Sequence, residues 1–468
     1  MSEKIKSSND IVSGNLWKQI LTFFFPILIG TFFQQMYNTV DTIIVGNYVG
    51  TEALAAVGAT STVINLFIGF FIGLASGASV IISQYFGAGD RDNVSKSVHT
   101  AIALALTGGV IIMIVGFLLA RPSMKLMGCP DDIIDDAVLY MNVYFAGVIG
   151  NLIYNIGTGI LRAIGDSKVP LYILIVCCIT NIILDLAFVL LFKWGVFGVG
   201  FATILSQLVS AVLILLRLMR TNDIYKLYIR KIRFDLGILK NIVRIGLPAG
   251  LQSVLYSFSN LLIQASINGF GTACIAAWSA IGKIDGFMWM VMNAFSVSVT
   301  TFAGQNFGAR RYDRVKETNR VGFILDMGCI IVISLVIFFF RVPLLQFFTS
   351  DEEVIRIGAE FFVVFAPSYF TYVFIAIFSA TIQGVGEALQ PMLITCFGVC
   401  GIRIIWLFTA VKIWPSMSMV AMNYPVSWVI TAVVFIIYYL RGNWLKRSIK
   451  RSHGEKCLEE YLASQKTA

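Results

Sequence analysis

The sequence predicts an all-α membrane protein with twelve transmembrane helices. Three observations support this fold class: 57% of the 468 residues are hydrophobic, only 13% are charged, and the mean hydropathy is +0.82. Soluble domains carry about 25% charged residues, so a soluble protein of this composition could not cover its surface. Twelve apolar segments of about 20 residues each would occupy about half of the chain.

Apolar runs that are long enough to cross a bilayer recur along the whole chain. The first run is unusually long and contains Pro26, which supplies a hinge where this helix can bend. An even number of spans places both termini on the same side of the membrane. The expected spans are 17–45, 53–80, 97–119, 137–160, 170–192, 197–216, 241–267, 273–300, 321–340, 358–380, 391–413 and 418–440.

Positive charge is distributed unevenly between the two sides of these spans. Of the 35 Lys and Arg residues, 27 fall in the termini and even-numbered loops and six in the odd-numbered loops. The positive-inside rule then places both termini in the cytoplasm. We therefore expect a multi-pass protein of the cell (cytoplasmic) membrane. The loops near 46–52 and 122–132 should be external, and the very basic loop at 217–244 should be cytoplasmic.

Matching segments that recur at a nearly constant offset indicate an internal repeat. The pairs are QYFGA at 84–88 with QNFGA at 305–309, GDSKVP at 165–170 with GEALQP at 386–391, and Pro26 with Pro248. Six spans per repeat give both halves the same orientation, as in transporters that bind substrate between two lobes. The expected divisions are an N-terminal lobe at 1–220, a cytoplasmic linker at 221–240, a C-terminal lobe at 241–441 and a basic cytoplasmic tail at 442–468.

Several kinds of site are not supported by the residue types present. The chain has only two histidines, which argues against a histidine-based metal site, and its eight cysteines show no secreted disulfide pattern. The glycine-containing segments 82–90 and 302–310 lack the spacing of a phosphate-binding loop. The polar segment 1–15 shows no pattern of a cleavable signal. We expect no cofactor, no nucleotide and no nucleic-acid partner, so the energy source would be an ion gradient.

Ionisable side chains inside apolar spans are costly and mark candidate functional sites. The residues of this kind are Asp41, Asp185, Asp285, Asp326, Lys283 and Arg403. The repeat supplies a control, because the second half has Ile263 in place of Asp41 and Leu407 in place of Asp185. The fold therefore does not require acids at those two places.

Four oxygen-bearing side chains come to a similar depth in the outer half of the N-terminal lobe: Asp41, Asn181, Asp185 and Thr203. At 1.5 Å per residue, Asp185 lies roughly 22 Å along its span from the cytoplasmic end, and Thr203 roughly 9 Å from the outer end of its own span. Asn181 is one helical turn from Asp185 and shares its face. Oxygen ligands suit a hard cation such as Na⁺, and paired carboxyl groups suit a proton. A neutral, hydrogen-bonded structural cluster is the alternative.

A second candidate site surrounds Asp285, which lies roughly 18 Å into its span and thus near mid-depth. An acid beside aromatic rings and flexible thioethers suits bulky lipophilic cations. The candidate substrate-binding residues are Asp285, Met288, Trp289 and Tyr37. The alternative is that the aromatic residues pack between helices or face lipid.

The remaining ionisable residues have structural explanations. Lys283 is two residues from Asp285 and so points to another part of the helix surface. Asp326 is expected to act as an interhelical hydrogen-bond partner. Arg403 is expected to lie near the cytoplasmic half and to extend its head group to the interface.

The sequence resembles the multidrug and toxic compound extrusion (MATE) family over nearly its whole length. The segments that carry the resemblance are 26–50 (PILIGTFFQQMYNTVDTIIVGNYVG), 82–90 (ISQYFGAGD), 161–170 (LRAIGDSKVP), 181–189 (NIILDLAFV) and 300–309 (TTFAGQNFGA). The resemblance implies twelve helices in two lobes around a central cavity, and efflux of organic cations or other toxic compounds driven by inward Na⁺ or H⁺. The chain is most similar to the DinF-like branch. That branch implies a cation site in the N-terminal lobe, formed by the same four residues, Asp41, Asn181, Asp185 and Thr203.

The leading hypothesis is a secondary active multidrug efflux transporter that works by antiport. The alternative is a flippase for lipid-linked saccharides, which would favour basic residues in the central cavity. A membrane enzyme would need a His, Cys or metal constellation that the spans do not offer, and the six-plus-six repeat argues against a channel or receptor. We expect a non-enzymatic monomer in the lipid bilayer, with lipophilic or cationic small molecules as substrates.

Overall fold

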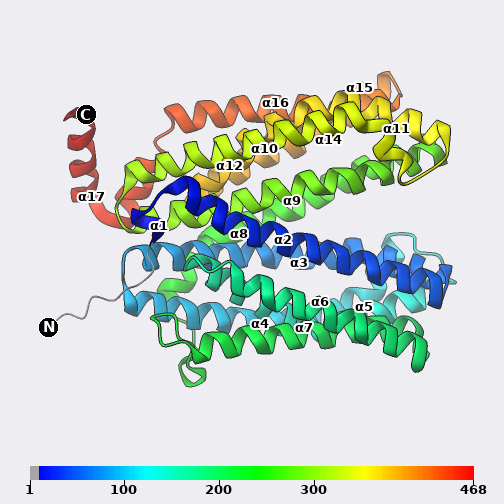
Figure 1. Cartoon of the computed structure of the whole chain (residues 1–468), viewed down its shortest axis with the longest axis horizontal. Coiled ribbons are helices and arrows are strands. Elements are labelled where there is room, and N and C mark those ends of the chain that lie inside the picture. The colour runs from blue at the N-terminus through cyan, green and yellow to red at the C-terminus, as the bar shows by residue number, and fades with distance from the viewer. Residues whose placement is uncertain (1–9, 468) are drawn as a thin grey trace. The chain divides into compact units, whose positions relative to one another are not determined.

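The computed structural model describes residues 10–467, which form helices and no strand (Figure 1). The first half contains α1 (Asp10–Ser13), α2 (Leu16–Ile44), η1 (Val45–Val49), α3 (Thr51–Gly87), α4 (Arg91–Leu126), α5 (Ile134–Ala163), α6 (Lys168–Leu186), η2 (Ala187–Leu191), α7 (Gly195–Arg220) and η3 (Ile229–Lys231). The second half contains α8 (Leu236–Asn268), α9 (Thr272–Gly308), α10 (Tyr312–Gln346), α11 (Glu352–Phe365), η4 (Ala366–Ser368), α12 (Tyr369–Gly384), α13 (Leu389–Thr395), η5 (Cys396–Gly401), α14 (Ile402–Phe408), α15 (Ala410–Ile413), α16 (Met417–Arg441) and α17 (Trp444–Thr467). Here η1, η2 and η5 are π-helical turns, whereas η3 and η4 are 3₁₀ turns.

Eleven helical segments in the described part of the chain are long and apolar enough to cross a membrane. They are 16–49, 51–87, 91–126, 134–163, 168–191, 195–220, 272–308, 312–346, 352–384, 389–413 and 417–441. The twelfth expected span corresponds to α8, which has 33 residues but carries polar side chains such as Gln252, Ser259 and Asn260 that lower its hydropathy. Helices of 37 residues such as α3 and α9 are about 55 Å long and so extend beyond a hydrocarbon core of about 30 Å.

The helices pack as two compact units. The N-terminal unit comprises residues 21–253, and the C-terminal unit comprises the described residues of 1–20 together with 254–467. In the N-terminal unit α5 packs against α3, α4 and α7, and in the C-terminal unit α9 packs against α10, α11 and α12. The divisions fall inside α2 and α8, so each of these two helices begins in one unit and ends in the other.

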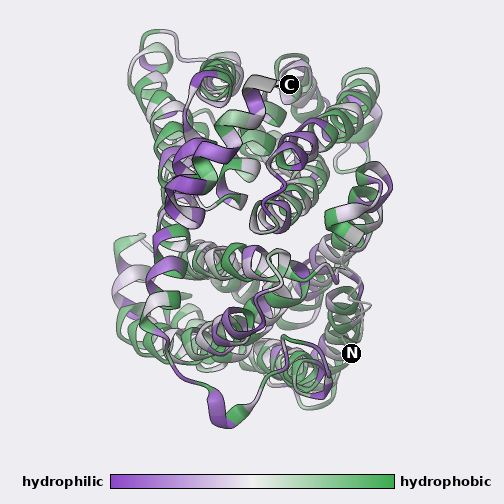
Figure 2. Ribbon diagram, turned by 90° about the vertical axis from the view of Figure 1, so that its left-hand side faces the viewer, coloured by the Kyte–Doolittle hydropathy of each residue, from purple (hydrophilic) through white to green (hydrophobic). Residues whose placement is uncertain are grey.

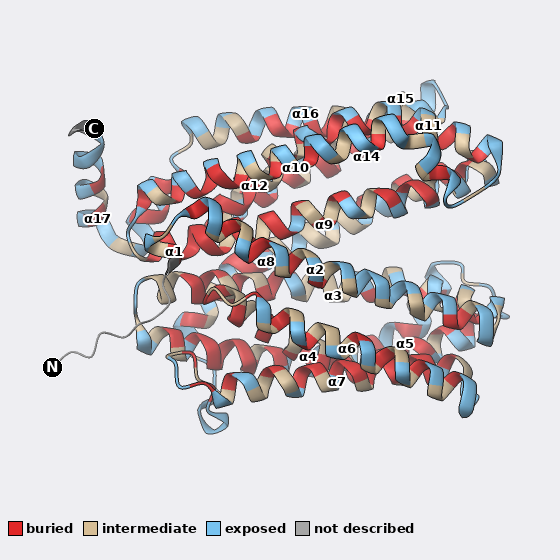
Figure 3. Ribbon diagram, viewed as in Figure 1, coloured by how far each residue is buried: buried red, intermediate tan, exposed pale blue. Residues whose placement is uncertain are grey.

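The long helices carry hydrophobic residues on their outer surfaces as well as inside the units. Figure 2 shows helices that are predominantly hydrophobic, with hydrophilic residues gathered toward the helix ends that face the viewer. Figure 3 shows buried residues on the inner faces of the helices and exposed residues on the outer faces. Leu118, Phe339, Phe397 and Leu440 are each 69% exposed or more. So many exposed large apolar side chains indicate lipid contact.

Two glycine pairs bring α3 and α8 very close together inside the N-terminal unit. Gly73 and Gly77 of α3 face Gly246 and Gly250 of α8. A Cβ atom on Gly77 would lie 2.6 Å from the backbone nitrogen of Gly246, and one on Gly246 would lie 2.7 Å from the Cα of Leu74. Small residues spaced four apart allow this backbone approach between membrane helices.

The connection after α7 folds back onto the N-terminal unit. His99 on α4 accepts a 3.0 Å hydrogen bond at Nε2 from the backbone N–H of Tyr228, and its Nδ1 donates to the carbonyl of Ser95 at 2.6 Å. The hydroxyl oxygen of Thr100 accepts a 3.1 Å bond from the backbone N–H of Asp235. His99 therefore has a structural role in anchoring this connection.

The C-terminal segment forms a helix that is docked on the C-terminal unit. In α17, Nδ1 of His453 lies 2.7 Å from the hydroxyl of Tyr312, and Arg451 forms an ion pair with the buried Glu387. Gly454 has a φ of 85°, and this left-handed residue kinks the helix at a position where a glycine carries little steric penalty.

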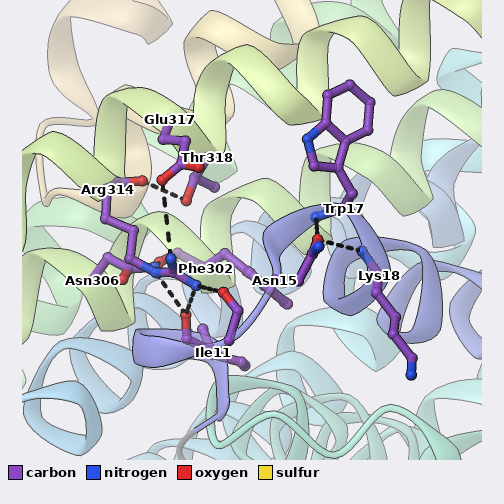
Figure 4. Close-up of polar contacts among 10 residues, drawn as sticks. Ile11, Asn15, Trp17, Lys18, Phe302, Asn306, Arg314, Glu317 and Thr318 are labelled. Atoms are coloured by element: carbon purple, nitrogen blue, oxygen red, sulfur yellow. Dashed lines mark hydrogen bonds and ion pairs between the residues drawn. The ribbon is translucent and has the colours of Figure 1, made fainter.

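The short helix α1 is also fastened to the C-terminal unit. The guanidinium of Arg314 on α10 donates to the carbonyl of Ile11 at 3.2 Å and to the carbonyl of Gly14 at 2.5 Å (Figure 4). Asn15 then begins α2, because its side-chain oxygen accepts from the backbone N–H of Trp17 at 3.0 Å. Residues 1–9, which include most of the polar segment considered in the sequence analysis, lie outside the described residues.

Candidate functional site

Two carboxyl groups meet in the N-terminal unit. Asp41 lies near the end of α2 and Asp185 near the end of α6, close enough for one proton between them to complete a hydrogen bond. Asp185 is 0% exposed, and neither of its oxygens has a hydrogen-bond partner among the described residues; the same holds for Oδ1 of Asp41. Two carboxylates in this environment repel each other, so a shared proton or a bound cation would stabilise them.

The other two predicted members of this site lie on the same group of helices. Asn181 precedes Asp185 by one turn on α6, is 0% exposed, and has no partner for its amide oxygen or nitrogen among the described residues. Thr203 lies on the neighbouring helix α7, where its hydroxyl donates to the carbonyl of Val199 at 3.0 Å and keeps oxygen lone pairs available. The site thus offers buried, unpaired oxygens of the kind that a hard cation prefers.

Tyrosines that the sequence analysis did not select lie near the two acids. Tyr140 and Tyr144 of α5 have ring centroids 6.4 Å apart, and Tyr140 is within electrostatic range of both carboxyl groups. Tyr37, predicted as a substrate-binding residue, precedes Asp41 by one turn on α2 and also interacts with it. The spacing of four residues between Tyr140 and Tyr144 is visible in the sequence, but nothing in the sequence places these tyrosines near the two acids.

The other three predicted substrate-binding residues, Asp285, Met288 and Trp289, lie in the C-terminal unit. Oδ2 of Asp285 accepts a 2.6 Å hydrogen bond from the indole nitrogen of Trp289, and the carboxyl group also interacts with the hydroxyl of Tyr369. Met288 is 0% exposed and packs in the core.

Trp289 belongs to an aromatic cluster that also includes Trp278, Phe361, Phe365, Tyr369, Tyr372, Tyr424 and Trp428. Its ring lies 4.7 Å from that of Tyr372 and 6.3 Å from that of Trp428. Asp285 is thus held at the edge of this cluster, on α9, while Trp428 lies on α16.

The expectation that Arg403 extends its head group to the interface is wrong. Arg403 is 1% exposed and its guanidinium lies 4.1 Å from the centroid of the Tyr424 ring. Nε reaches the hydroxyl of Ser427 and Nη1 reaches the amide oxygen of Asn260, both at 3.4 Å, while Nη2 has no partner among the described residues. Aromatic faces and neutral oxygens replace water around this charge, which explains why it can stay buried.

The two remaining ionisable residues differ in burial. Asp326 on α10 is 0% exposed, and neither of its oxygens has a hydrogen-bond partner among the described residues, so the expected interhelical hydrogen bond is not found there. Lys283 is exposed on the surface of α9, away from the buried face of that helix. Neither residue joins the acids of the N-terminal unit or the aromatic cluster.

The same family model matches the chain twice, over residues 26–187 and 248–409. The chain belongs to the MatE family. The two matches have the same length and each begins at a proline, Pro26 in the first and Pro248 in the second, which confirms the internal repeat. The family resemblance expected from the sequence is thereby confirmed for this MatE protein, and so is the all-helical fold of two repeated halves.

Similar proteins support this placement of the MatE protein. The probable multidrug resistance protein YoeA of Bacillus subtilis is 27% identical over 446 residues, which cover 93% of this chain and 96% of the relative. The probable multidrug resistance protein YpnP of the same organism is 26% identical over 439 residues, covering 93% and 97%. A solved structure described as MATE in the bent conformation is 25% identical, covers 95% of this chain and 99% of its own, and superimposes with a TM-score of 0.85.

The MatE protein has no group of three or more His, Cys, Asp or Glu residues placed to hold a metal ion in its described part. A cation bound at Asp41 and Asp185 would therefore need neutral oxygens to complete its coordination. The unpaired amide oxygen of Asn181 fits this requirement.

Proposed function

We propose that this MatE protein is a secondary active multidrug efflux transporter that exports organic cations or other lipophilic toxic compounds by antiport with Na⁺ or H⁺. The names of the relatives that align over 93% of the chain support drug efflux. The observation that carries ion coupling is the contact between the buried carboxyl group of Asp185 and that of Asp41, whose Oδ1 is also buried without a hydrogen-bond partner among the described residues. Asn181 and Thr203 act as neutral oxygen ligands when the ion is Na⁺.

Coupling requires that ion binding alters the helix that carries Asp41. Pro26 lies in the same helix, and because proline lacks a backbone N–H, α2 is weaker and easier to bend there. A cation that enters from outside relieves the repulsion between the acids and lets α2 bend at Pro26, which displaces substrate outward. The driving force is sufficient, since one charge that moves inward yields about 2.3 kcal/mol per 100 mV.

Substrate recognition in the C-terminal unit is assigned to Asp285 and the aromatic cluster beside it. A carboxylate at the edge of several rings attracts an organic cation by charge and by the negative faces of the rings. In the N-terminal unit, Tyr37 is assigned as a substrate contact of that unit, next to the ion site. The protein works as a monomer in the cytoplasmic membrane, with both termini inside the cell and without a cofactor.

The test is gradient-driven efflux of a cationic dye from proteoliposomes, under a Na⁺ gradient alone and under a pH gradient alone. Asp41→Asn and Asp185→Asn should each abolish ion-driven efflux while dye binding remains, because the amide mimics the neutralised carboxyl group. The double variant should be no worse than either single variant, as expected for one functional unit. Asp326→Asn is the matched control, since it neutralises another buried acid in a span.

Efflux at the wild-type rate by folded Asp41→Asn protein would show that the coupling site lies elsewhere. The same vesicles also test the alternative of a flippase for lipid-linked saccharides, which the names of the relatives do not support. Translocation of labelled lipid without movement of dye would favour the flippase.

A further inference from the structure

The repeat relates the proposed ion site to a specific set of residues in the second half. The two family matches are 222 residues apart both where they begin, at Pro26 and Pro248, and where they end, at 187 and 409, whereas the segments 84–88 and 165–170 between these ends recur 221 residues later. At the offset of 222, Asp41 corresponds to Ile263 and Asp185 corresponds to Leu407. Asn181 corresponds to Arg403. The second half therefore lacks both carboxyl groups and has a guanidinium at the position of the amide ligand.

The surroundings of Arg403 have the composition of a cation-binding site. Its guanidinium carbon lies 4.1 Å from the ring centroid of Tyr424, 5.8 Å from that of Tyr256 and 5.9 Å from that of Trp428. Neutral oxygens of Ser427 and Asn260 complete the contacts. Aromatic faces and neutral oxygens of this kind stabilise cations.

No acid forms an ion pair with Arg403 in the described part of the chain. The nearest link to an acid that the contacts define runs through rings, from Trp428 to Trp289 and then to Asp285. The carboxyl group of Asp285 is thus within electrostatic range of Arg403, but the guanidinium contacts rings and neutral groups and forms no ion pair with that acid.

We propose that Arg403 is a tethered cation that fills, in the second half of the repeat, the site that corresponds to the exchangeable cation site of the first half. The correspondence with an ion site rests on the proposed function. The cation-binding character of the cage around Arg403, which is formed by the three rings and two neutral oxygens named above, is independent of that function. A guanidinium keeps its charge in proteins and cannot leave the chain. One half therefore exchanges its cation in each cycle and the other half remains permanently loaded.

This arrangement has two consequences. The site around Arg403 contributes no coupling ion, because it has neither a vacant position nor an acid in place of Asp41 and Asp185. The ring faces around Arg403 are also already occupied, so a cationic substrate must approach the aromatic cluster from the side of Asp285.

Chemical rescue tests the cation site directly. Arg403→Ala in the full-length protein in detergent removes the side chain and leaves its cage. We expect a lower Tm than in the wild type, and we expect millimolar methylguanidinium to raise that Tm by several degrees while leaving the wild type unchanged. Methylurea is the matched control, because it has nearly the same shape without the charge. Equal effects of both compounds, or no effect of methylguanidinium on folded variant, would overturn the proposal.

A second pair of variants keeps the test decisive if Arg403→Ala does not fold. Arg403→Lys retains a tethered charge and should retain efflux and the wild-type ratio of ions to substrate, whereas Arg403→Gln should lose efflux several-fold. Wild-type efflux by Arg403→Gln, or equal loss in both variants, would assign Arg403 a packing role and reject the tethered cation. These outcomes are separable from failure of the coupling site, which is read from Asp41→Asn under a gradient.

Discussion

The indole nitrogen of Trp289 donates a 2.6 Å hydrogen bond to Asp285, its neighbour one turn earlier on α9. This bond fixes the orientation of the carboxyl group. The hydroxyl of Tyr369 interacts with the same carboxyl group, so donors from the aromatic cluster surround this acid. The acid and its tryptophan therefore form a preorganised pair at the edge of the aromatic cluster.

Asp285→Asn is expected to weaken the binding of cationic substrates. In a site of low effective dielectric, loss of the charge should cost at least about 1 kcal/mol, or several-fold in affinity. Neutral substrates should be affected less. Fluorescence titration with a cationic and a neutral dye measures the difference, and Trp289→Phe serves as a control that removes the hydrogen bond but keeps a ring. Unchanged affinity for the cationic dye would remove Asp285 from the site.

The fold could be predicted from the sequence because its determinants are local. Span length follows from runs of apolar residues, and the repeat follows from segments that recur at a nearly constant offset. The pair of acids was also predictable, since Asp41 and Asp185 stand out as charges inside apolar runs. The same reasoning assigned Arg403 to the interface, because a lone charge in a span gives no information about the rings that surround it. Those rings come from α8 and α16, and only tertiary packing brings them to Arg403.

Helix pairing is a second feature that the sequence did not provide. The spacing of Gly73 with Gly77, and of Gly246 with Gly250, is visible in the sequence as two small-xxx-small patterns. Either pattern could face lipid or any other helix. The structure shows that they face each other, which is information about partners that a single sequence does not contain.

The orientation in the membrane can be tested with a natural cysteine. Cys129 lies in a loop that the charge distribution places outside the cell, and it is partly exposed. An impermeant maleimide should label wild-type protein in intact cells, and Cys129→Ser should abolish that labelling. Asn222→Cys in the Cys129→Ser background should be labelled only after permeabilisation. Labelling of the introduced cysteine in intact cells would reverse the proposed topology.

The close approach of α3 and α8 predicts an asymmetry between two glycines of the same helix. Gly77→Ala places a Cβ atom 2.6 Å from the backbone nitrogen of Gly246, so the helices must separate, and overpacking of this kind destabilises by about 1–3 kcal/mol. Gly58→Ala is the matched control, because nothing lies within 4 Å of a Cβ atom there. The control substitution should leave the stability of the protein unchanged or raise it by about 0.5–1 kcal/mol, since glycine is less favourable than alanine inside a helix. Thermal unfolding in detergent measures both, and equal Tm values for the two variants would contradict the packing.

The docking of α17 is expected to weaken in acid, through His453. Burial, followed by the charge of Arg310, lowers the pKa of His453 from 6.5 to about 4. The neutral ring is favoured when the helix is docked, and its Nδ1 pairs with the hydroxyl of Tyr312. When the helix is released, His453 takes up a proton below its ordinary pKa. The stabilisation is therefore fully present above pH 6.5 and is lost progressively as the pH falls toward 4.

His453→Gln provides the comparison that isolates this effect. Glutamine offers an acceptor to Tyr312 but does not titrate, and all other acidic and basic groups around α17 are common to both proteins. The difference in Tm between wild type and variant should be constant above pH 6.5 and should shrink between pH 6.5 and pH 4, because only the wild type loses stability in this window. The half-buried position of His453 exposes it to solvent screening, which reduces the size of the change but not its sign. A difference in Tm that does not vary with pH would show that His453 does not control the docking of α17.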